Sequence, residues 1–377
     1  MKSTHRIMAG LALAALLGST VAHAQDAEAM TRLLTTVEQK ASLVGVAGGV
    51  IEDGQVAVAG AAGLRRAGGD VPLSPSDTFH VGSLTKSFTA TLIGTLVDDG
   101  VLDWDTRVGD VFDGAHASWQ GVTVSELLTH SAGAPPNFPM IAFAAPDPAT
   151  RDALAKRRRG LVEVLVSQPL PGERGDFAYS NVGYTVAAVL AEELTNAAWE
   201  DLLTARVLRP LDISAGFGAP TDDGAPWGHR SSEGIDIGVD PAKSRADNPA
   251  FMRPAGGLHM DIEGLLRWAD FRLGDGSELL SPESFAQLRD SAVAMNARQS
   301  YAGGWIVDPS GGGIGAGPLV WHNGSNTMWY ALLMLFPDQN GAIAMVSNDG
   351  DMPRAEPALV RAAAMIAKRR GWATSGE

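Results

Sequence analysis

The segment Ser83-Leu84-Thr85-Lys86 places a hydroxyl and an amine three residues apart, where a helix over residues 83–97 is predicted to begin. Side chains at positions i and i+3 of a helix share one face, so the lysine amine can reach the serine oxygen. An amine that takes the serine proton makes this oxygen a good nucleophile, provided that burial or a nearby cation lowers the pKa of the lysine. Free N–H groups at the start of the helix would also favour an oxyanion beside Ser83. On its own, however, Ser-x-x-Lys is a common tetrapeptide that also marks ordinary surface turns.

A second candidate segment is the turn-rich loop over residues 171–184, which leads into a predicted helix. Its Tyr179 and Asn181 are separated by one residue and could supply a proton-transfer group and a substrate-positioning amide. The structural alternative is that Tyr179 belongs to the core and that Asn181 caps the helix. The sequence leaves both interpretations open.

A third segment, residues 321–326, lies between two predicted strands and contains His322 and Gly324. A histidine titrates near neutral pH, and a glycine close to it lets a substrate backbone approach. The alternative is a polar strand edge with a glycine kink.

Together the three segments resemble the serine β-lactamase and penicillin-binding protein superfamily, whose motifs are Ser-x-x-Lys, Tyr-x-Asn and Lys/His-x-Gly. The branch that the chain resembles most contains class C β-lactamases, D-alanyl-D-alanine carboxypeptidases, D-aminopeptidases and related esterases. The resemblance extends over residues 30–370 and includes the further segments 127–133, 179–184, 208–211, 255–258 and 303–305. The three motifs occur in the order of the family, as Ser83-x-x-Lys86, Tyr179-x-Asn181 and His322-x-Gly324.

The resemblance implies a role for each matching residue. Ser83 would be the acylated nucleophile, and Lys86 and Tyr179 would share general-base and general-acid work, with either able to take the serine proton. The backbone N–H groups of Ser83 and Ser325 would form the oxyanion hole. Acylation would be followed by hydrolysis with water, with no cofactor and no metal ion. The residues implied to bind substrate are Asn181, His322, Gly324 and Ser325.

The residue at position 322 separates the branches of the superfamily. Class C β-lactamases usually carry lysine there, whereas a histidine that is largely neutral at pH 7 attracts a substrate carboxylate less strongly. Arg253 could supply a replacement cation, although we favour a surface charge. We therefore predict an exported serine hydrolase that cleaves an ester or a small D-amino-acid peptide bond. The alternatives are a class C-type β-lactamase and a penicillin- or peptidoglycan-binding sensor that is acylated without turnover.

Other hydrolytic chemistries find little support. The sequence contains neither Gly-x-Ser-x-Gly nor His-Glu-x-x-His, which mark α/β-type serine hydrolases and zinc hydrolases. We interpret His80 and His130 as structural residues rather than metal ligands. The basic run over residues 156–159 is interpreted as the solvated face of a helix.

The N-terminus has the features of a secretory signal. Lys2 and Arg6 precede a short apolar run over residues 8–17, and Ala22-His23-Ala24 fits a cleavage site. We therefore predict a signal peptide over residues 1–24 and a mature protein in the periplasm. The apolar run is too short to span a bilayer, so no stable membrane span is expected after cleavage.

The amino-acid composition limits which classes of binding partner the protein can have. The 377 residues include no cysteine, which excludes disulfides and zinc–thiolate sites, and the formal net charge of −14 argues against nucleic acid. The expected partner is a small-molecule ester, peptide or β-lactam substrate, and the oligomeric state is left open.

The hydrophobic pattern predicts an α+β fold. Two strands are expected near the N-terminus, over residues 44–51 and 55–61, and a long helical block follows them. Four strands are expected over residues 301–308, 318–322, 328–336 and 342–348, before a final helix over 354–369. The economical arrangement is one antiparallel sheet built from both chain ends, flanked by helices, with a mostly helical lobe inserted. In this scheme residues 25–377 form one catalytic domain, with an α/β lobe over 25–80 and 296–377 and a helical lobe over 81–295.

Overall fold

A computed structural model of the chain describes residues 25–232, 234–243, 246–290 and 292–373. The predicted signal peptide over residues 1–24 lies outside the described residues, so export stays a prediction. Within the described part of the chain, no helix is both long and apolar enough to cross a membrane.

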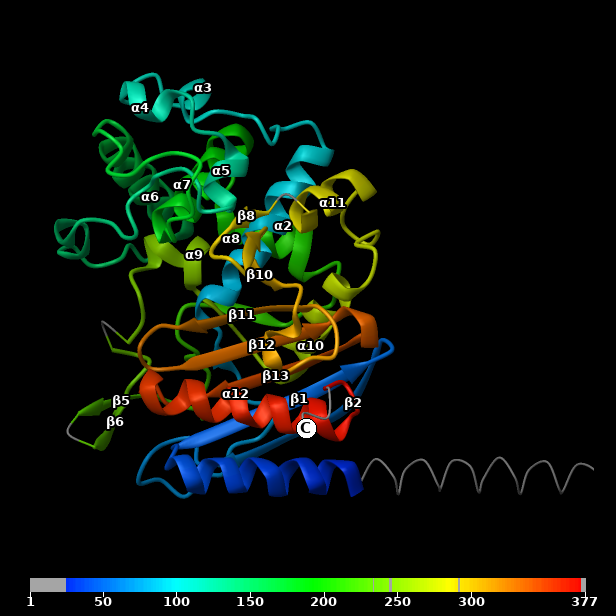
Figure 1. Cartoon of the computed structure of the whole chain (residues 1–377). Helices are drawn as coiled ribbons and strands as arrows, with labels where there is room; N and C mark the ends of the chain where they lie inside the picture. The colour runs from blue at the N-terminus through cyan, green and yellow to red at the C-terminus, as the bar shows by residue number, and fades with distance from the viewer. Residues whose placement is uncertain (1–24, 233, 244–245, 291, 374–377) are drawn as a thin grey trace, which may run out of the picture.

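The main sheet has eight strands in the order β2-β1-β13-β12-β11-β10-β9-β8, and each neighbouring pair is antiparallel. The strands from the two chain ends therefore pair inside the sheet, near its β2 edge, where β1 lies beside β13 (Figure 1). This arrangement confirms the predicted α+β fold class. The strands are β1 (Gly45–Glu52), β2 (Gln55–Gly63), β8 (Val293–Ala294), β9 (Ser300–Ala302), β10 (Trp305–Asp308), β11 (Leu319–Ser325), β12 (Tyr330–Phe336) and β13 (Gly341–Ser347).

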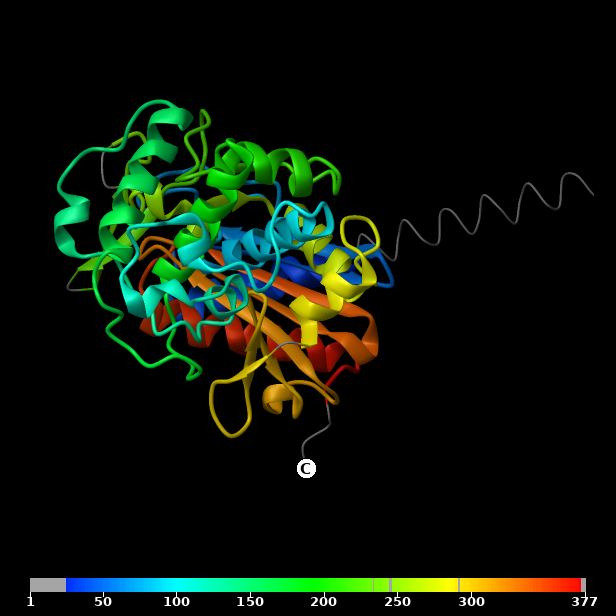
Figure 2. The same cartoon turned by 90° about the horizontal axis from the view of Figure 1, so that it is seen from above.

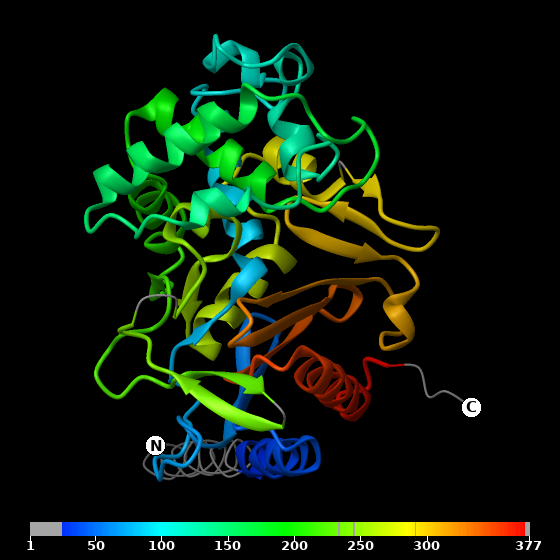
Figure 3. The same cartoon turned by 90° about the vertical axis from the view of Figure 1, so that its left-hand side faces the viewer.

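Both faces of the sheet are buried, because alternate residues of its central strands enter two different cores. On β1, Val46 and Val50 pack with the C-terminal helix α12 (Met352–Arg369), whereas Ala47 and Ile51 pack with α10 (Ile262–Leu273). The period of two in the side-chain direction of a strand produces this division. Figure 3 shows α12 and the helix over residues 25–41 together on the side away from the helical lobe.

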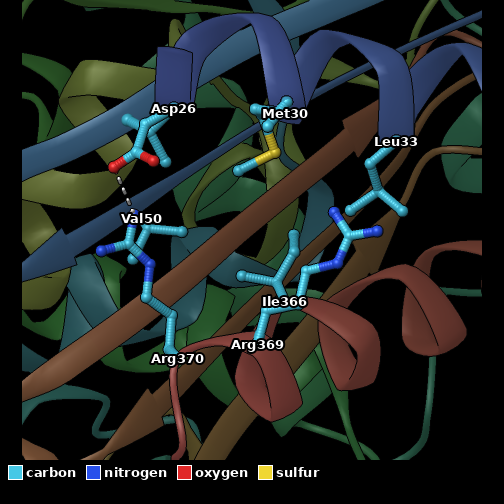
Figure 4. Close-up of a pocket in the computed structure, with 9 residues that line it drawn as sticks. Asp26, Met30, Leu33, Val50, Ile366, Arg369 and Arg370 are labelled. Atoms are coloured by element: carbon cyan, nitrogen blue, oxygen red, sulfur yellow. Dashed lines mark ion pairs between the residues drawn. The ribbon is translucent and has the colours of Figure 1, made fainter. Parts of the chain in front are cut away.

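The helix over residues 25–41 and α12 enclose a hollow of about 260 Å³ against β1 and β2 (Figure 4). Its floor is apolar, and Arg370 at its rim pairs with Asp26 at 3.8 Å and with Glu52 at 3.1 Å. These ion pairs connect the two ends of the described chain. The hollow contains none of the predicted site residues; its lining is Asp26, Ala29, Met30, Leu33, Val50, Val58, Ile366, Arg369 and Arg370.

The segment between β2 and β8 is mainly helical and lies over one face of the sheet (Figure 2). Its central helix is α2, which is buried along most of its length. A small sheet (β3-β7-β4) and the hairpin β5–β6 complete this part of the chain. The helices are α2 (Thr85–Asp98), α3 (Val108–Val111), α4 (Ala117–Gln120), α5 (Val124–Leu128), α6 (Arg151–Val166), α7 (Asn181–Thr195), α8 (Trp199–Leu203), α9 (Arg253–Gly256) and α11 (Pro282–Asp290), and the short strands are β3 (Phe79–His80), β4 (Ala215–Phe217), β5 (Gly228–Ser232), β6 (Ile235–Val239) and β7 (Leu258–Met260).

The prediction of one strand over residues 301–308 is wrong, because this segment is the hairpin β9–β10. Gly303 and Gly304 form its turn with φ values of +50° and +91°, a backbone region that favours glycine. A Cβ atom on Gly304 would lie 2.5 Å from the backbone of Ser87, so the turn packs closely on α2. The strand predicted over residues 318–322 extends further than expected, since β11 continues to Ser325.

The interpretation of residues 156–159 as a solvated face is wrong for Arg158, which is fully buried. Its guanidinium pairs with Glu192 on α7 and, at 2.7 Å, with Glu200 on α8. Burial of a charged side chain requires partners of this kind. The basic run therefore supplies one structural ion cluster as well as surface charges.

Candidate active site

Ser83 lies in a 3₁₀ turn (Gly82–Leu84) that leads directly into α2, and Lys86 lies in the first turn of α2. This placement brings the Lys86 Nζ atom to 3.0 Å from Ser83 Oγ, as the i, i+3 spacing predicts. β11 runs beside this turn.

The amine of Lys86 has two further neighbours, and both are carbonyl oxygens. Nζ donates to Asn181 Oδ1 at 2.8 Å and to the backbone oxygen of Ala255 at 2.6 Å. A neutral amine has two N–H donors and one lone pair. If the two donors bind these two oxygens, the lone pair is left to accept the proton of Ser83.

Within the described part of the chain no carboxylate pairs with Lys86, and its side chain is fully buried. The Tyr179 and Tyr184 rings lie close to it, with centroids 4.8 Å and 5.7 Å from Nζ. Burial therefore lowers the pKa of Lys86 well below its ordinary value. A lysine of lowered pKa can be a base near neutral pH, which is what activation of Ser83 requires.

Tyr179 lies on the loop before α7 with its ring over the Lys86 amine. Burial raises the pKa of its phenol well above the ordinary value, and a hydrogen bond with Ser83 offsets part of this rise. The phenol therefore keeps its proton at neutral pH. The opposite pKa shifts of Lys86 and Tyr179 favour a base role for the amine and an acid role for the phenol.

The side chain of Asn181 does not cap α7, so that alternative is wrong. Ser180 is the N-cap, and its Oγ accepts the N–H of Gly183 at 3.0 Å. Asn181 is therefore free to use its oxygen for Lys86, while its Nδ2 donates to Asn137 Oδ1 at 2.8 Å.

The backbone N–H groups predicted to form the oxyanion hole come from two segments in very close contact. A Cβ atom on Gly82 would lie 2.3 Å from the nitrogen of Ser325, and one on Gly324 would lie 2.6 Å from the nitrogen of Ser83. Gly82 also has a φ of +52°. Glycine at both positions lets the turn before α2 approach β11, so that the Ser83 and Ser325 N–H groups lie near one spot.

His322 lies on β11 behind Tyr179, with the two ring centroids 6.4 Å apart, and it is only 2% exposed. Burial and the nearby charge of Lys86 lower the pKa of His322 to about 3, so the ring is neutral. Both ring nitrogens have protein neighbours: Nδ1 contacts the backbone oxygen of Asn323, and Nε2 lies 3.3 Å from the hydroxyl of Tyr301. A neutral ring in this setting offers no positive charge to a carboxylate.

Comparison with known proteins identifies the family. A family model described as Beta-lactamase matches residues 20–367. The chain belongs to this family.

Its relatives include penicillin-binding protein 4 of Amycolatopsis lactamdurans, with 27% identity over 77% of each chain. Protein flp of Staphylococcus aureus strain N315 is 23% identical over 82% of this chain, which spans 60% of the length of that relative. Among solved structures, a beta-lactamase from Sulfitobacter sp. EE-36 aligns with a TM-score of 0.74 at 20% identity, over 93% of this chain and 99% of the other. Members of the beta-lactamase fold superfamily are generally serine hydrolases.

The sequence analysis missed three contributors to this beta-lactamase-family site. Ala255 supplies the carbonyl that binds Lys86, and Tyr301 contacts His322. The ring of His130, interpreted only as structural, packs 4.3 Å from the Tyr179 ring and accepts the N–H of Ser180 at 3.1 Å. The segments 127–133 and 255–258 contain His130 and Ala255 and had signalled these two regions without assigning a catalytic role, whereas Tyr301 lies outside every such segment.

Arg253 lies at the start of α9, and its guanidinium is 3.8 Å from the buried carboxylate of Glu200. This pairing directs the charge towards the ion cluster of Arg158. The described contacts of Arg253 therefore give no support to the replacement-cation alternative.

An apolar hollow of about 340 Å³ lies beside the site, on the helical lobe. Asn137 belongs both to its wall and to the hydrogen bond with Asn181. The hollow can accommodate an uncharged apolar group. The other lining residues are Trp119, Pro135, Phe138, Pro139, Ile141, Ala142, Leu161, Val164, Leu165, Gln168, Pro169 and Pro171.

Proposed function

We propose that the protein is a serine hydrolase that forms an acyl-enzyme on Ser83 and cleaves an ester, or a small D-amino-acid peptide bond, in a substrate that needs no cation of the protein to bind a carboxylate. The observation that carries this proposal is the buried amine of Lys86, whose hydrogen-bond partners among the described residues are neutral oxygens, with Ser83 Oγ at 3.0 Å. Membership of the beta-lactamase family supports the same chemistry at the coarser level.

In the acylation step, Ser83 Oγ attacks the substrate carbonyl carbon while its proton passes to the Lys86 amine. The carbonyl π electrons move to the oxygen, which the N–H groups of Ser83 and Ser325 stabilise. An oxyanion-hole donor of this kind is typically worth about 3–4 kcal/mol in the transition state. The tetrahedral intermediate then collapses, and the leaving atom takes a proton relayed from Lys86 through the Tyr179 phenol.

Deacylation uses the same groups in the reverse order. Water attacks the acyl carbon, its proton passes through Tyr179 to Lys86, and Ser83 leaves as the alcohol with that proton. The neutral Lys86 is restored, so the cycle needs no group from outside the chain other than water.

The choice of substrate follows from His322. The His322 ring is neutral and buried, and Arg253 pairs with Glu200. Neither residue is therefore available as a cation for a substrate carboxylate. β-Lactams carry such a carboxylate, so we rank them after esters. The apolar hollow beside Asn137 favours an acyl group of apolar character.

The test compares a short-chain nitrophenyl ester, a D-Ala-D-Ala peptide and a chromogenic cephalosporin. We expect ester turnover to exceed cephalosporin turnover and to be lost in Ser83→Ala. Ser87→Ala is the matched control, since Ser87 lies one residue after Lys86 and its hydroxyl bonds Leu84 and Trp268 rather than the site. Mass spectrometry of the protein with each substrate reports acylation.

Each other outcome overturns a named part of the proposal. Ester turnover that survives in Ser83→Ala would remove the mechanism. Rapid cephalosporin turnover without ester activity would favour a β-lactamase, and stable acylation without turnover would favour a sensor.

A further inference from the structure

A buried chain of polar contacts lies behind the two segments that carry the proposed oxyanion hole. His80, on β3, accepts the backbone N–H of Gly82 through Nδ1 at 3.1 Å. Gly82 is the residue directly before Ser83. This contact is buried, and the His80 side chain is fully buried.

The second ring nitrogen of His80 faces an aspartate. Nε2 lies 3.0 Å from Asp247 Oδ1, whose side chain is 14% exposed. Because Nδ1 accepts a hydrogen bond, it carries no proton, and the ring proton lies on Nε2. The ring therefore faces Asp247 with a donor and Gly82 with an acceptor.

The same aspartate oxygen also holds the second segment. Asn326 Nδ2 donates to Asp247 Oδ1 at 2.8 Å, and Asn326 is the residue directly after Ser325. Burial alone would raise the pKa of Asp247, but His80, Asn326 and the Asn248 N–H together hold it below its ordinary value. Asp247 therefore stays ionised as an acceptor for both segments.

We propose that His80, Asp247 and Asn326 are positioning residues that set the distance between the N–H groups of Ser83 and Ser325. This inference rests on the proposed function, since it assigns these N–H groups to the oxyanion. None of the three residues touches the reacting atoms. They act by fixing the residue before one donor and the residue after the other.

An oxyanion hole requires that its N–H donors be placed precisely around the oxyanion. Its donors stabilise the transition state only at about 2.7–3.1 Å from the oxyanion, and a misplacement of about 1 Å can cost roughly 100-fold in rate. The Ser83 turn and β11 belong to segments far apart in the sequence. Asp247 Oδ1 contacts both Asn326 and the His80 ring that accepts the Gly82 N–H, and this link gives the two segments a fixed relative position.

The experiment measures kcat and KM for ester hydrolysis per functional site, with functional sites counted by burst titration. We expect Asp247→Ala to lower kcat by about 10- to 100-fold with little change in KM, because oxyanion stabilisation acts in the transition state. Asp247→Asn keeps an oxygen at the Oδ1 position, so it is expected to retain most of kcat. Asn326→Ala, which cuts the chain at its other end, is the second variant if Asp247→Ala does not fold.

Asp308→Ala is the matched control for loss of a buried carboxylate. Asp308 is 3% exposed and accepts Ser310 hydrogen bonds at the end of β10. We expect a lower Tm with unchanged kcat per functional site.

The inference is overturned if Asp247→Ala and Asn326→Ala keep wild-type kcat per functional site, or if Asp308→Ala lowers kcat equally. A loss in Asp247→Asn as large as that in Asp247→Ala would also overturn it, since charge rather than position would then be required. Ser83→Ala, measured in parallel, separates the two proposals. Activity that survives there contradicts the proposed function, whereas its loss beside normal Asp247 variants contradicts only the positioning role.

Discussion

Two fully buried cationic side chains, Lys86 and Arg158, lie in the helical part of the molecule, and their surroundings differ. Arg158 pairs with the carboxylates of Glu192 and Glu200 and donates to the backbone oxygen of Phe251 at 3.0 Å. Lys86 contacts a hydroxyl, an amide oxygen and a backbone carbonyl, all of them neutral.

The difference decides what each cation can do. Two carboxylates compensate the charge of Arg158, so the cluster joins α6, α7 and α8 as a structural unit. Neutral oxygens compensate Lys86 poorly, and its pKa falls. Equal burial therefore gives a structural ion cluster in one place and a candidate base in the other.

The largest expected effect is the loss of acylation in Lys86→Met. Methionine fills a similar volume but cannot take the proton of Ser83, so we expect acylation to fall by at least about 1,000-fold, as in Ser83→Ala, because the two residues act as a unit. The measurement is burst-phase acylation by a nitrophenyl ester. Near-wild-type acylation in Lys86→Met would mean that the buried amine is not the base.

The next effect is on stability rather than chemistry. Arg158→Met removes the cation that pairs with buried Glu192 and leaves Glu200 with the more distant guanidinium of Arg253, at 3.8 Å. We expect the free energy of unfolding to fall by about 3–5 kcal/mol. Denaturant unfolding measures this change. The acylation rate per functional site is expected to stay much closer to wild type than in Lys86→Met.

Arg151→Met is the control for this comparison. It makes the same substitution on the same helix, but the Arg151–Asp201 pair is about half exposed on both sides. Exposed pairs contribute about 0–1 kcal/mol, so little destabilisation is expected. Equal losses in the two variants would contradict a special role for the buried cluster.

The parts of the site that depend on local spacing could be predicted from the sequence. The i, i+3 spacing of Ser83 and Lys86 is a property of one helix turn, and the apolar runs over residues 44–51 and 342–348 predicted the strands β1 and β13. The capping box of Thr123 and Glu126 at the start of α5 is another local feature, since both residues lie within one turn.

The parts that depend on distant partners could not be predicted. Lys86 and Ala255 are 169 positions apart, and Arg158 reaches Glu192 and Glu200 from two other helices. A basic run in a sequence does not reveal which member points inward. The hairpin at Gly303 likewise depends on close packing against α2, which periodicity does not report.

The smallest expected effect comes from making the surroundings of Lys86 more like those of Arg158. Asn181→Asp places a carboxylate on the 2.8 Å contact with Nζ, and this charge raises the pKa of Lys86 from its lowered value. Lys86 is a base only above its folded-state pKa, so the acid limb of kcat/KM moves to higher pH. At any pH below the raised pKa, activity falls by up to about tenfold for each unit of the rise. Asn137→Asp, one hydrogen bond further from Nζ, is the matched control and is expected to move the limb less. An acid limb that does not move in Asn181→Asp would show that it reports a group other than Lys86, and the contrast between the two buried cations would then not explain the chemistry.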